Sequence, residues 1–238
     1  MPQTTPPKKP PTKKASPRGA QKRVHVKTRK NRSISSSRWL ERQLNDPYVA
    51  AAKTEGYRSR AAFKIVQMDE DLHLFKSGQK VIDLGAAPGG WTQIAVDRVK
   101  PGKATGGRVV AIDYLGMPEV PGAEFICLDF MDNNAPDLLK KAIGGKADLV
   151  LSDMAPPTIG HKRTDHLRIM ALAEAAYLFA REVLVPGGTF LSKVFMGGAE
   201  RDLLNQLKKD FTKVKHIKPH ASRADSSEMY VVALGFRG

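Results

Sequence analysis

The segment of residues 81–93, VIDLGAAPGGWTQ, constrains the fold more than any other part of the sequence. It runs from an apolar strand through a glycine-rich turn into the start of a helix. Gly85, Gly89 and Gly90 have no Cβ atom, so the backbone of this turn can approach a ligand closely. In open parallel sheets, ligands bind beyond the carboxyl ends of the strands, where the strand order reverses. The segment therefore predicts a ligand-binding turn at the edge of a parallel sheet.

From Lys80 onward, short apolar runs alternate with helix-like stretches. The first strands are continuous Val, Ile and Leu runs, as expected when both faces of a sheet are covered. This alternation predicts a doubly wound α/β fold, with a mainly parallel seven-stranded sheet and helices on both faces. We expect strands over 80–84, 108–113, 123–128, 147–153, 188–195 and 229–236, with a short strand at 214–218 forming a terminal antiparallel hairpin. We expect helices over 35–44, from Ser59 onward, and over 91–99, 133–142, 164–184 and 200–209.

The glycine-rich turn does not match either common nucleotide fingerprint. A dinucleotide site requires G-x-G-x-x-G, but Ala87 stands at the second glycine; a P-loop requires lysine after its last glycine, where Trp91 stands. Asp83 would repel a phosphate but suits an ammonium group, such as that of S-adenosylmethionine. Asp113 and Asp129 end the next two strands, where they could bind ribose hydroxyls and the adenine amino group. Each aspartate alone could cap a turn, but three on successive strands favour S-adenosylmethionine as cofactor.

Positive charge is concentrated at the N-terminus. The formal net charge is +15, and residues 1–34 hold eleven Lys or Arg and no acidic residue. The rest of the chain, with 28 basic and 24 acidic residues, has a net charge of only +4. This Pro-rich, apolar-poor stretch predicts a disordered tail, followed by a folded domain over residues 35–238. A polyanion such as RNA is the expected partner of the tail; a solubilising tail and an anionic membrane surface are the alternatives.

Hydropathy and cysteine content indicate a cytoplasmic protein. No stretch approaches the 18–20 apolar residues, roughly, that a membrane span requires, and no hydrophobic run follows the basic N-terminus as in a secretory signal. A mitochondrial transit peptide is the remaining alternative for the basic N-terminus. The single cysteine, Cys127, lies in the apolar run AEFICLDF and is expected to be a buried structural thiol. We predict no metal site and, because no dimerisation element is visible, a monomer.

Six motifs in order make the sequence specific. They are SSSRWL, GYRSRAAFK, VIDLGAAPGGWTQ, VLSDMAPP, VPGGTFLSKVF and SSEMYVVALGF. Together they resemble the bacterial heat-shock 2′-O-ribose methyltransferase family called FtsJ or RrmJ, over roughly Ser35 to Gly238. The resemblance implies a Rossmann-like S-adenosylmethionine-dependent methyltransferase that acts on an RNA ribose 2′-hydroxyl. The family members most similar to this sequence methylate a uridine of 23S rRNA within the assembled large ribosomal subunit, and the resemblance implies the same substrate here.

The resemblance also assigns site residues. The family's Lys-Asp-Lys-Glu catalytic group falls on Lys64 in SRAAFK, Asp153 in LSDMAPP, Lys193 in FLSKVF and Glu228 in SSEMY. The cofactor positions fall on Gly89, Trp91, Asp113, Asp129 and Asp153. Pro157 departs from the family, whose members often have Asn after MAP, and the long basic tail is absent from the shortest members.

Lys193 is the candidate proton acceptor, because a ribose hydroxyl must lose its proton as it attacks the methyl group. Burial, the nearby Lys64 and a positive sulfonium would favour a neutral amine, whereas Asp153 and Glu228 would favour an ammonium group. In the alternative mechanism, the four residues only align the hydroxyl and stabilise its developing charge. The sequence leaves this choice open.

Several basic residues outside the tail are candidate RNA contacts. Arg38, Arg58 and Arg60 flank the Lys64 helix, and Lys218 and Arg223 precede Glu228. The rival functions are a tRNA ribose methyltransferase, a small-molecule methyltransferase, and a ribosome-assembly factor that binds RNA without catalysis. The complete catalytic set argues against the last, and the basic tail is unexplained by a small-molecule substrate.

Overall fold

The structure is a computed structural model that describes residues 24–25, 34–102, 107–157, 159–195 and 201–238. The chain divides into two units, Met1–Ala51 and Ala52–Gly238. The first unit contains helix α1 (Ile34–Leu44) and the beginning of α2 (Pro47–Glu55). Within it, Asn45 exchanges two hydrogen bonds with the backbone of Val24, of 2.7 and 2.8 Å. Nearly all of the predicted tail, residues 1–34, lies outside the described residues, so its disorder and its boundary stay predictions.

Helix α2 was not among the predicted elements. Its sequence, PYVAAAKTE, is short and rich in alanine, so it lacks the apolar periodicity that marks an amphipathic helix. The sequence signal for α2 lies at the N-terminus of the helix instead. Asp46 precedes Pro47 and accepts a hydrogen bond from the backbone N–H of Tyr48 at 3.1 Å. A capping aspartate followed by proline at the first helical position is a typical helix start.

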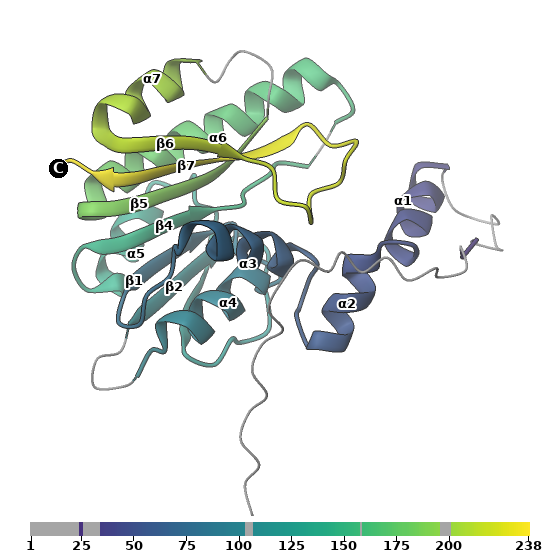
Figure 1. Ribbon diagram of the computed structural model, residues 1–238, viewed down its shortest axis with the longest axis horizontal. Coiled ribbons are helices and arrows are strands. Elements are labelled where there is room, and N and C mark those ends of the chain that lie inside the picture. The colour runs from purple at the N-terminus through teal and green to yellow at the C-terminus, as the bar shows by residue number, and fades with distance from the viewer. Residues whose placement is uncertain (1–23, 26–33, 103–106, 158, 196–200) are drawn as a thin grey trace, which may run out of the picture. The chain divides into compact units, whose positions relative to one another are not determined.

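The second unit is built on a sheet with the strand order β3-β2-β1-β4-β5-β7-β6 in the described residues (Figure 1). Strand β7 is antiparallel to both of its neighbours, and the other neighbouring pairs are parallel. This confirms the predicted mainly parallel sheet of seven strands and its terminal β6–β7 hairpin. The strands are β1 (Lys80–Leu84), β2 (Arg108–Asp113), β3 (Ala123–Cys127), β4 (Ala147–Ser152), β5 (Leu184–Phe195), β6 (Phe211–Ile217) and β7 (Glu228–Phe236).

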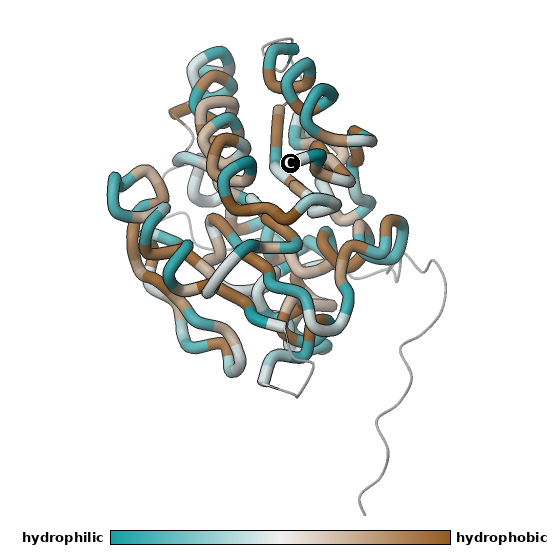
Figure 2. Tube along the Cα trace, turned by 90° about the vertical axis from the view of Figure 1, so that its left-hand side faces the viewer, coloured by the Kyte–Doolittle hydropathy of each residue, from teal (hydrophilic) through white to brown (hydrophobic). Residues whose placement is uncertain are grey.

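Helices cover both faces of this sheet, as predicted. On one face α3 (Ala61–Leu72) and α4 (Gly90–Val99) pack against the strands through one apolar cluster. On the other face a second cluster joins the strands to α5 (Ala135–Ile143), α6 (Lys162–Val183) and α7 (Arg201–Asp210). Hydropathy alternates along these helices, because each buries one stripe and exposes the other (Figure 2). In the part of the chain that the structure describes, no helix is long and apolar enough to cross a bilayer.

The strand order reverses between β1 and β4. The chain moves outward from β1 to β2 and β3, then returns to place β4 on the other side of β1. Leu84 and Ser152, the last residues of β1 and β4, are paired, and the N–H of Asp153 donates to the carbonyl of Leu84 at 3.1 Å. Gly85 and Asp153 therefore leave the sheet side by side at the switch point, the usual ligand site of such sheets.

Cys127 corrects one expectation. Its thiol was predicted to be buried, yet Cys127 is exposed. The reason is position: β3 is the outer strand of the sheet, with a partner on one side only, and Cys127 is its last residue. An apolar run on an edge strand is only half covered, and the sequence run alone does not distinguish an edge strand from a central one.

Asp83 is a carboxyl group in the interior of the sheet. It lies in β1, is fully buried, and accepts a hydrogen bond from Thr92 Oγ1 at 2.7 Å. Its other oxygen, Oδ1, has no hydrogen-bond partner among the described residues. Burial raises the pKa of Asp83 to about 7; the hydrogen bond from Thr92 opposes this rise, and the nearby carboxylates of Asp153 and Asp113 add to it. The folded protein therefore holds a proton on Asp83 that the unfolded chain releases near pH 4.

This pKa predicts how stability depends on pH. As the pH rises from about 4 to 7 the unfolded chain loses its Asp83 proton first, so this group's contribution to folding stability falls across that window. We expect Asp83→Asn, which keeps an acceptor for Thr92, to raise the free energy of unfolding at pH 8 by on the order of 2–4 kcal/mol and to change it little at pH 4. Urea unfolding at pH 4, 5, 6, 7 and 8 measures the difference. Asp137→Asn, at a side chain that is 88% exposed, is the control, and a gain from Asp83→Asn that is equal at every pH would contradict the prediction.

Candidate active site

The fold brings the four predicted catalytic residues together from four elements. Lys64 lies on α3, Asp153 follows β4, Lys193 lies in β5, and Glu228 begins β7. Ser152 and Ser192 are paired between β4 and β5, so Asp153 and Lys193 occupy adjacent positions on neighbouring strands. Their proximity thus follows from the strand register, whereas Lys64 reaches the cluster from the helix layer that covers this face.

Ion pairs connect the four residues in a chain of alternating charge. Lys193 Nζ lies 2.7 Å from Asp153 Oδ1 and also donates to the backbone carbonyl of Asp153 at 2.8 Å. Lys64 Nζ lies 2.7 Å from Glu228 Oε1. The two pairs meet where Lys193 Nζ lies 4.0 Å from Glu228 Oε2. Two positive and two negative groups make the cluster neutral in total, which lets it be mostly buried.

Tyr230 is a member of the site that the sequence analysis missed. Its hydroxyl donates to Asp153 Oδ1 at 2.7 Å and accepts a hydrogen bond from Lys64 Nζ at 3.1 Å, so it joins the two ion pairs. Tyr230 is also the paired residue of Lys193 across β5 and β7. A signal was present in SSEMY: side chains two residues apart on a strand share a face, so Glu228 and Tyr230 point to the same side.

The charges around Asp153 keep it ionised. Burial by itself would raise the pKa of Asp153. The positive charges of Lys193 and Lys64, together with hydrogen bonds from Lys193 and Tyr230, outweigh burial and lower that pKa below its usual value. Asp153 is therefore a carboxylate over the physiological pH range.

Tyr230 titrates in the opposite direction. Burial, the negative charges of Asp153 and Glu228, and the hydrogen bond that its hydroxyl donates to Asp153 raise the pKa of Tyr230 well above its ordinary value. The phenol thus stays neutral and keeps its proton for Asp153. An ionised carboxylate and a neutral phenol form a fixed framework around the two lysines.

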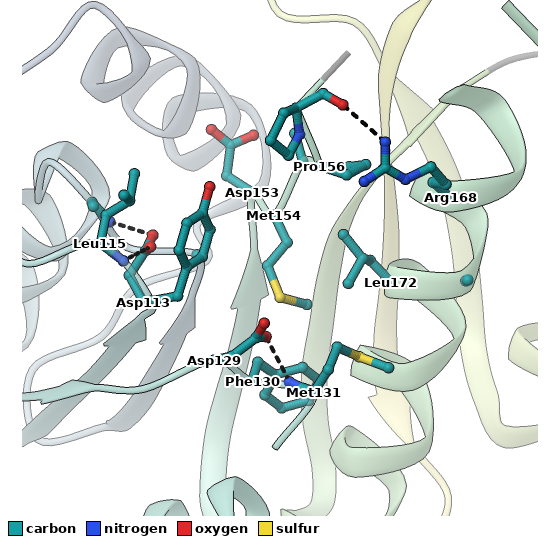
Figure 3. A pocket seen from close by; sticks show the side chains of 16 residues that line it. Asp113, Leu115, Asp129, Phe130, Met131, Asp153, Met154, Pro156, Arg168 and Leu172 are labelled. Atoms are coloured by element: carbon teal, nitrogen blue, oxygen red, sulfur yellow. Dashed lines mark hydrogen bonds between the residues drawn. The ribbon is translucent and has the colours of Figure 1, made fainter. Parts of the chain in front are cut away.

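A pocket of about 610 Å³ opens at the switch point of the sheet. Asp113, Asp129 and Asp153 stand around it, with Met154 among them (Figure 3). Asp113 accepts backbone hydrogen bonds from Ala87 at 2.9 Å and from Leu115 at 2.8 Å, one on each carboxylate oxygen. The wall between the acids is largely apolar, formed by residues that include Leu115, Phe130, Met131 and Leu172.

Gly85 lines the same pocket, as the glycine-rich turn predicts. Its φ of +78° is in the left-handed region, and a Cβ atom at this position would lie 2.7–2.9 Å from atoms of Met154. Only glycine allows β1 to turn here while Met154 closes the floor of the pocket. The turn continues through a cis peptide bond between Ala87 and Pro88.

Three residues assigned to the cofactor do not line the pocket. Asp83 is buried against Thr92, as described above. The Trp91 indole is buried beneath α3, where its Nε1 donates to the carbonyl of Ala61 at 2.8 Å. Gly89 precedes α4 with a φ of +102°, and a Cβ atom there would lie 2.9 Å from Arg58 Nη1. The structure gives each of them a role in shaping the turn, and direct contact with a ligand stays a prediction.

The basic residues predicted to contact RNA are mostly engaged within the protein. Arg58 donates to the carbonyls of Pro88, Pro118 and Glu119, and Arg60 donates to the carbonyl of Ala221. Lys218 donates to the carbonyls of Ala224 and Ser226. Arg223 is half-buried, and the side chain of Arg38 lies outside the described residues. RNA contact by these five residues stays a prediction.

Comparisons with known proteins identify the family of this chain. The FtsJ-like methyltransferase family model matches residues 57–236. The protein named ribosomal RNA large subunit methyltransferase E from Paramagnetospirillum magneticum is 61% identical over 216 residues, covering 90% of this chain and 88% of the relative. Its namesake from Bradyrhizobium diazoefficiens is 62% identical over 216 residues, covering 90% and 94%.

A solved structure shows the same architecture. A protein from Plasmodium falciparum, described as a ribosomal RNA methyltransferase, has a TM-score of 0.68 and 31% identity to this chain. The match covers 76% of this chain and 100% of the solved one. The motifs and the fold agree with the family match over most of the sequence, and the chain belongs to the FtsJ-like methyltransferase family.

Proposed function

We propose that the protein transfers a methyl group from S-adenosylmethionine to the ribose 2′-hydroxyl of a uridine in 23S rRNA. The observation that carries this proposal is the double position of Asp153. One carboxylate lines the pocket at the switch point and also holds Lys193 at 2.7 Å. A methyl donor bound in the pocket and the proton acceptor Lys193 would therefore both lie next to Asp153. Methyl transfer to a hydroxyl requires the donor, the hydroxyl and the proton acceptor to be held close together.

The pocket fits S-adenosylmethionine in its chemistry. Each Asp113 oxygen accepts one backbone N–H and keeps a second lone pair, so this carboxylate can accept hydrogen bonds from two ribose hydroxyls. Asp129 accepts the N–H of Met131 through Oδ1, and no partner of Oδ2 is found among the described residues, which leaves it for the adenine amino group. Gly85 and Met154 line the same pocket, and we infer that the methionine part lies against them. When bound, S-adenosylmethionine supplies a methyl group on a positively charged sulfonium.

Lys193 is held in a geometry that suits proton transfer. Its two close acceptors are Oδ1 and the backbone carbonyl of Asp153. A bound sulfonium would favour the neutral form of the Lys193 amine. In that form the amine has two N–H bonds and one lone pair, so these acceptors use both N–H bonds and leave the lone pair to take a proton from the ribose hydroxyl. Asp153 thereby orients Lys193, and Tyr230, which accepts a hydrogen bond from Lys64, holds Asp153 in place.

The relatives support the choice of RNA. Two proteins named for methylation of large-subunit ribosomal RNA share 61% and 62% identity with this chain over most of their own length. We further propose that the substrate uridine lies in the assembled large ribosomal subunit and that the protein acts as a monomer in the cytoplasm. The basic tail then supplies sequence-independent attraction to phosphates.

Tritiated methyl transfer tests the substrate directly. Purified protein with labelled S-adenosylmethionine is incubated with large ribosomal subunits, naked rRNA and tRNA, and the modified nucleotide is mapped. We expect label on the large subunit, at a 2′-O-methyluridine. Label on tRNA alone would identify a tRNA methyltransferase, and absence of label from every RNA would favour an assembly factor without catalysis; either result would refute the proposal.

Lys193 should be required for the chemical step. We expect Lys193→Ala to lower the single-turnover rate of methyl transfer by about 10²- to 10⁴-fold, the usual contribution of a general base, with little change in affinity for S-adenosylmethionine. Lys215→Ala, at an exposed lysine of β6, is the matched control and should retain the normal rate. A near-normal rate for Lys193→Ala would remove Lys193 from the mechanism.

The tail should act on binding and leave the chemical step unchanged. We expect deletion of residues 1–34 to weaken RNA affinity and to reduce the slope of log K against log salt by about 0.7–0.9 for each phosphate that the tail neutralises. The single-turnover rate at saturating RNA should be unchanged. A chain whose eleven basic tail residues are replaced by serine and glycine keeps the length of the tail and removes its charge. Equal affinities of the natural protein, the deletion variant and this substituted chain across the salt titration would show that the tail does not bind RNA.

A further inference from the structure

One side of α3 faces the segment between β6 and β7, residues 218–227, hereafter the 218–227 segment (Figure 1). Arg60, at the start of the helix, Lys64 and Gln67 follow a spacing of four and three residues, which puts them on one helix face. All three contact residues that follow β6. Lys64 binds Glu228, while Arg60 and Gln67 both bind Ala221.

Ala221 is held through both polar groups of its backbone. Its N–H donates to Gln67 Oε1 at 2.8 Å, and its carbonyl accepts a hydrogen bond from Arg60. Ala221 is fully buried, so water cannot replace these partners. Because an unpaired buried N–H is costly, the two side chains of α3 determine where this part of the segment lies.

The next residue transmits this position to the active site. Ser222 Oγ donates to Glu228 Oε1 at 2.9 Å, the same oxygen that lies 2.7 Å from Lys64 Nζ. The Glu228 N–H donates to Ser226 Oγ at 3.2 Å, and Lys218 closes the segment on the carbonyl of Ser226 at 2.7 Å. A closed ring of contacts thus runs from Gln67 through Ala221, Ser222 and Glu228 back to Lys64 on the same helix.

The ring controls which carboxylate Lys64 binds. Lys64 has two acidic neighbours: it pairs with Glu228 and also acts on Asp153, whose pKa it helps to lower. If Glu228 moved away, Lys64 would retain only Asp153 as a counter-charge and would compete with Lys193 for it. Lys193 would then lose the fixed orientation on which proton transfer depends.

We propose that Gln67 is a positioning residue for the methyl transfer: by fixing Ala221 it holds Glu228 against Lys64 and leaves Asp153 to orient Lys193. The inference rests on the proposed function for its kinetic consequence, and its structural part stands without it. Gln67 is not among the described residues that line the pocket, and its effect passes through Ala221 and Ser222 to Glu228.

Two variants separate hydrogen bonding from shape. Gln67→Met keeps the length of the side chain but lacks a strong acceptor, whereas Gln67→Glu keeps an acceptor oxygen. We expect Gln67→Met to lower kcat about tenfold, the scale of one unpaired buried N–H, with little change in KM for S-adenosylmethionine. Gln67→Glu should stay within about twofold of the natural protein, and Gln206→Met, at an exposed glutamine of α7, should not change kcat.

A double-mutant cycle and hydrogen exchange complete the test. In a Glu228→Ala background Gln67→Met should cause no further loss of kcat, because the residue through which it acts is gone. Hydrogen exchange of the Ala221 amide should be slow in the natural protein and in Gln67→Glu, and fast in Gln67→Met.

Each outcome decides the inference. Normal kcat in Gln67→Met, an equal loss in the Glu228→Ala background, or an Ala221 amide that exchanges fast in the natural protein would overturn it. Hydrogen exchange needs no RNA, so it tests the structural part of the inference separately. If the chain methylated no RNA, the proposed function would be refuted; the expected exchange pattern would still support the role of Gln67 in fixing the segment.

Discussion

The ion pair between Lys193 and Asp153 is the interaction on which the rest of the site depends. Both side chains are largely removed from water, at 9% and 16% exposure, so each would be costly to hold as an isolated charge. Their attraction offsets that cost only while the geometry is good and the remaining hydrogen-bonding positions are filled. The neighbouring groups provide this: the Asp153 carbonyl binds Lys193, and Tyr230 binds Asp153. The pair is placed by strand register, because β4 and β5 are paired one residue earlier, at Ser152 and Ser192, and Asp153 directly follows the end of β4.

The same constraint explains why the site is assembled from separate elements. A single buried pair would leave the carboxylate lone pairs of Asp153 partly unfilled, and Lys64 and Tyr230 supply the missing positive charge and donor. Lys64 in turn requires a counter-charge of its own, which Glu228 provides from β7. Each added group supplies a counter-charge or a hydrogen bond to a group already in the cluster, and the total charge of the cluster is zero. Removing any one charged member leaves the cluster with an uncompensated buried charge, so we expect the four charged residues to behave as a unit.

Sequence patterns predict the buried strands and the residues at strand ends, because both leave a local signal. They do not predict the surroundings of side chains whose position depends on tertiary contacts. Continuous apolar runs revealed β1 and β2 with their bounds, because both strands are buried on two faces. Asp113 and Asp129 were placed at the pocket because carboxyl ends of parallel strands share one edge. The four proposed catalytic positions came from the family resemblance, since a single lysine on a helix or a single acid before a strand carries no such signal. Cys127, by contrast, lies in an apolar run that turned out to be an edge strand. Trp91 follows the glycine turn, yet its indole points beneath α3, and Tyr230 became a candidate only once its register against β5 was known.

The contrast between Asp83 and Asp153 shows how position decides the chemistry of a carboxyl group. Both lie near the carboxyl ends of neighbouring strands: Asp83 is paired with Leu151, two residues before Asp153. Both are largely removed from water. Asp83 has a single hydroxyl partner, so burial dominates and raises its pKa to about 7. Asp153 has two lysines and a phenol, so charge dominates and its pKa falls. The negative charge of Asp153 itself contributes to the proton held on Asp83. Asp153 thus provides an ionised carboxylate at the surface of the pocket. Asp83, deeper in the sheet, stays largely neutral below pH 7, which avoids repulsion between two adjacent buried anions.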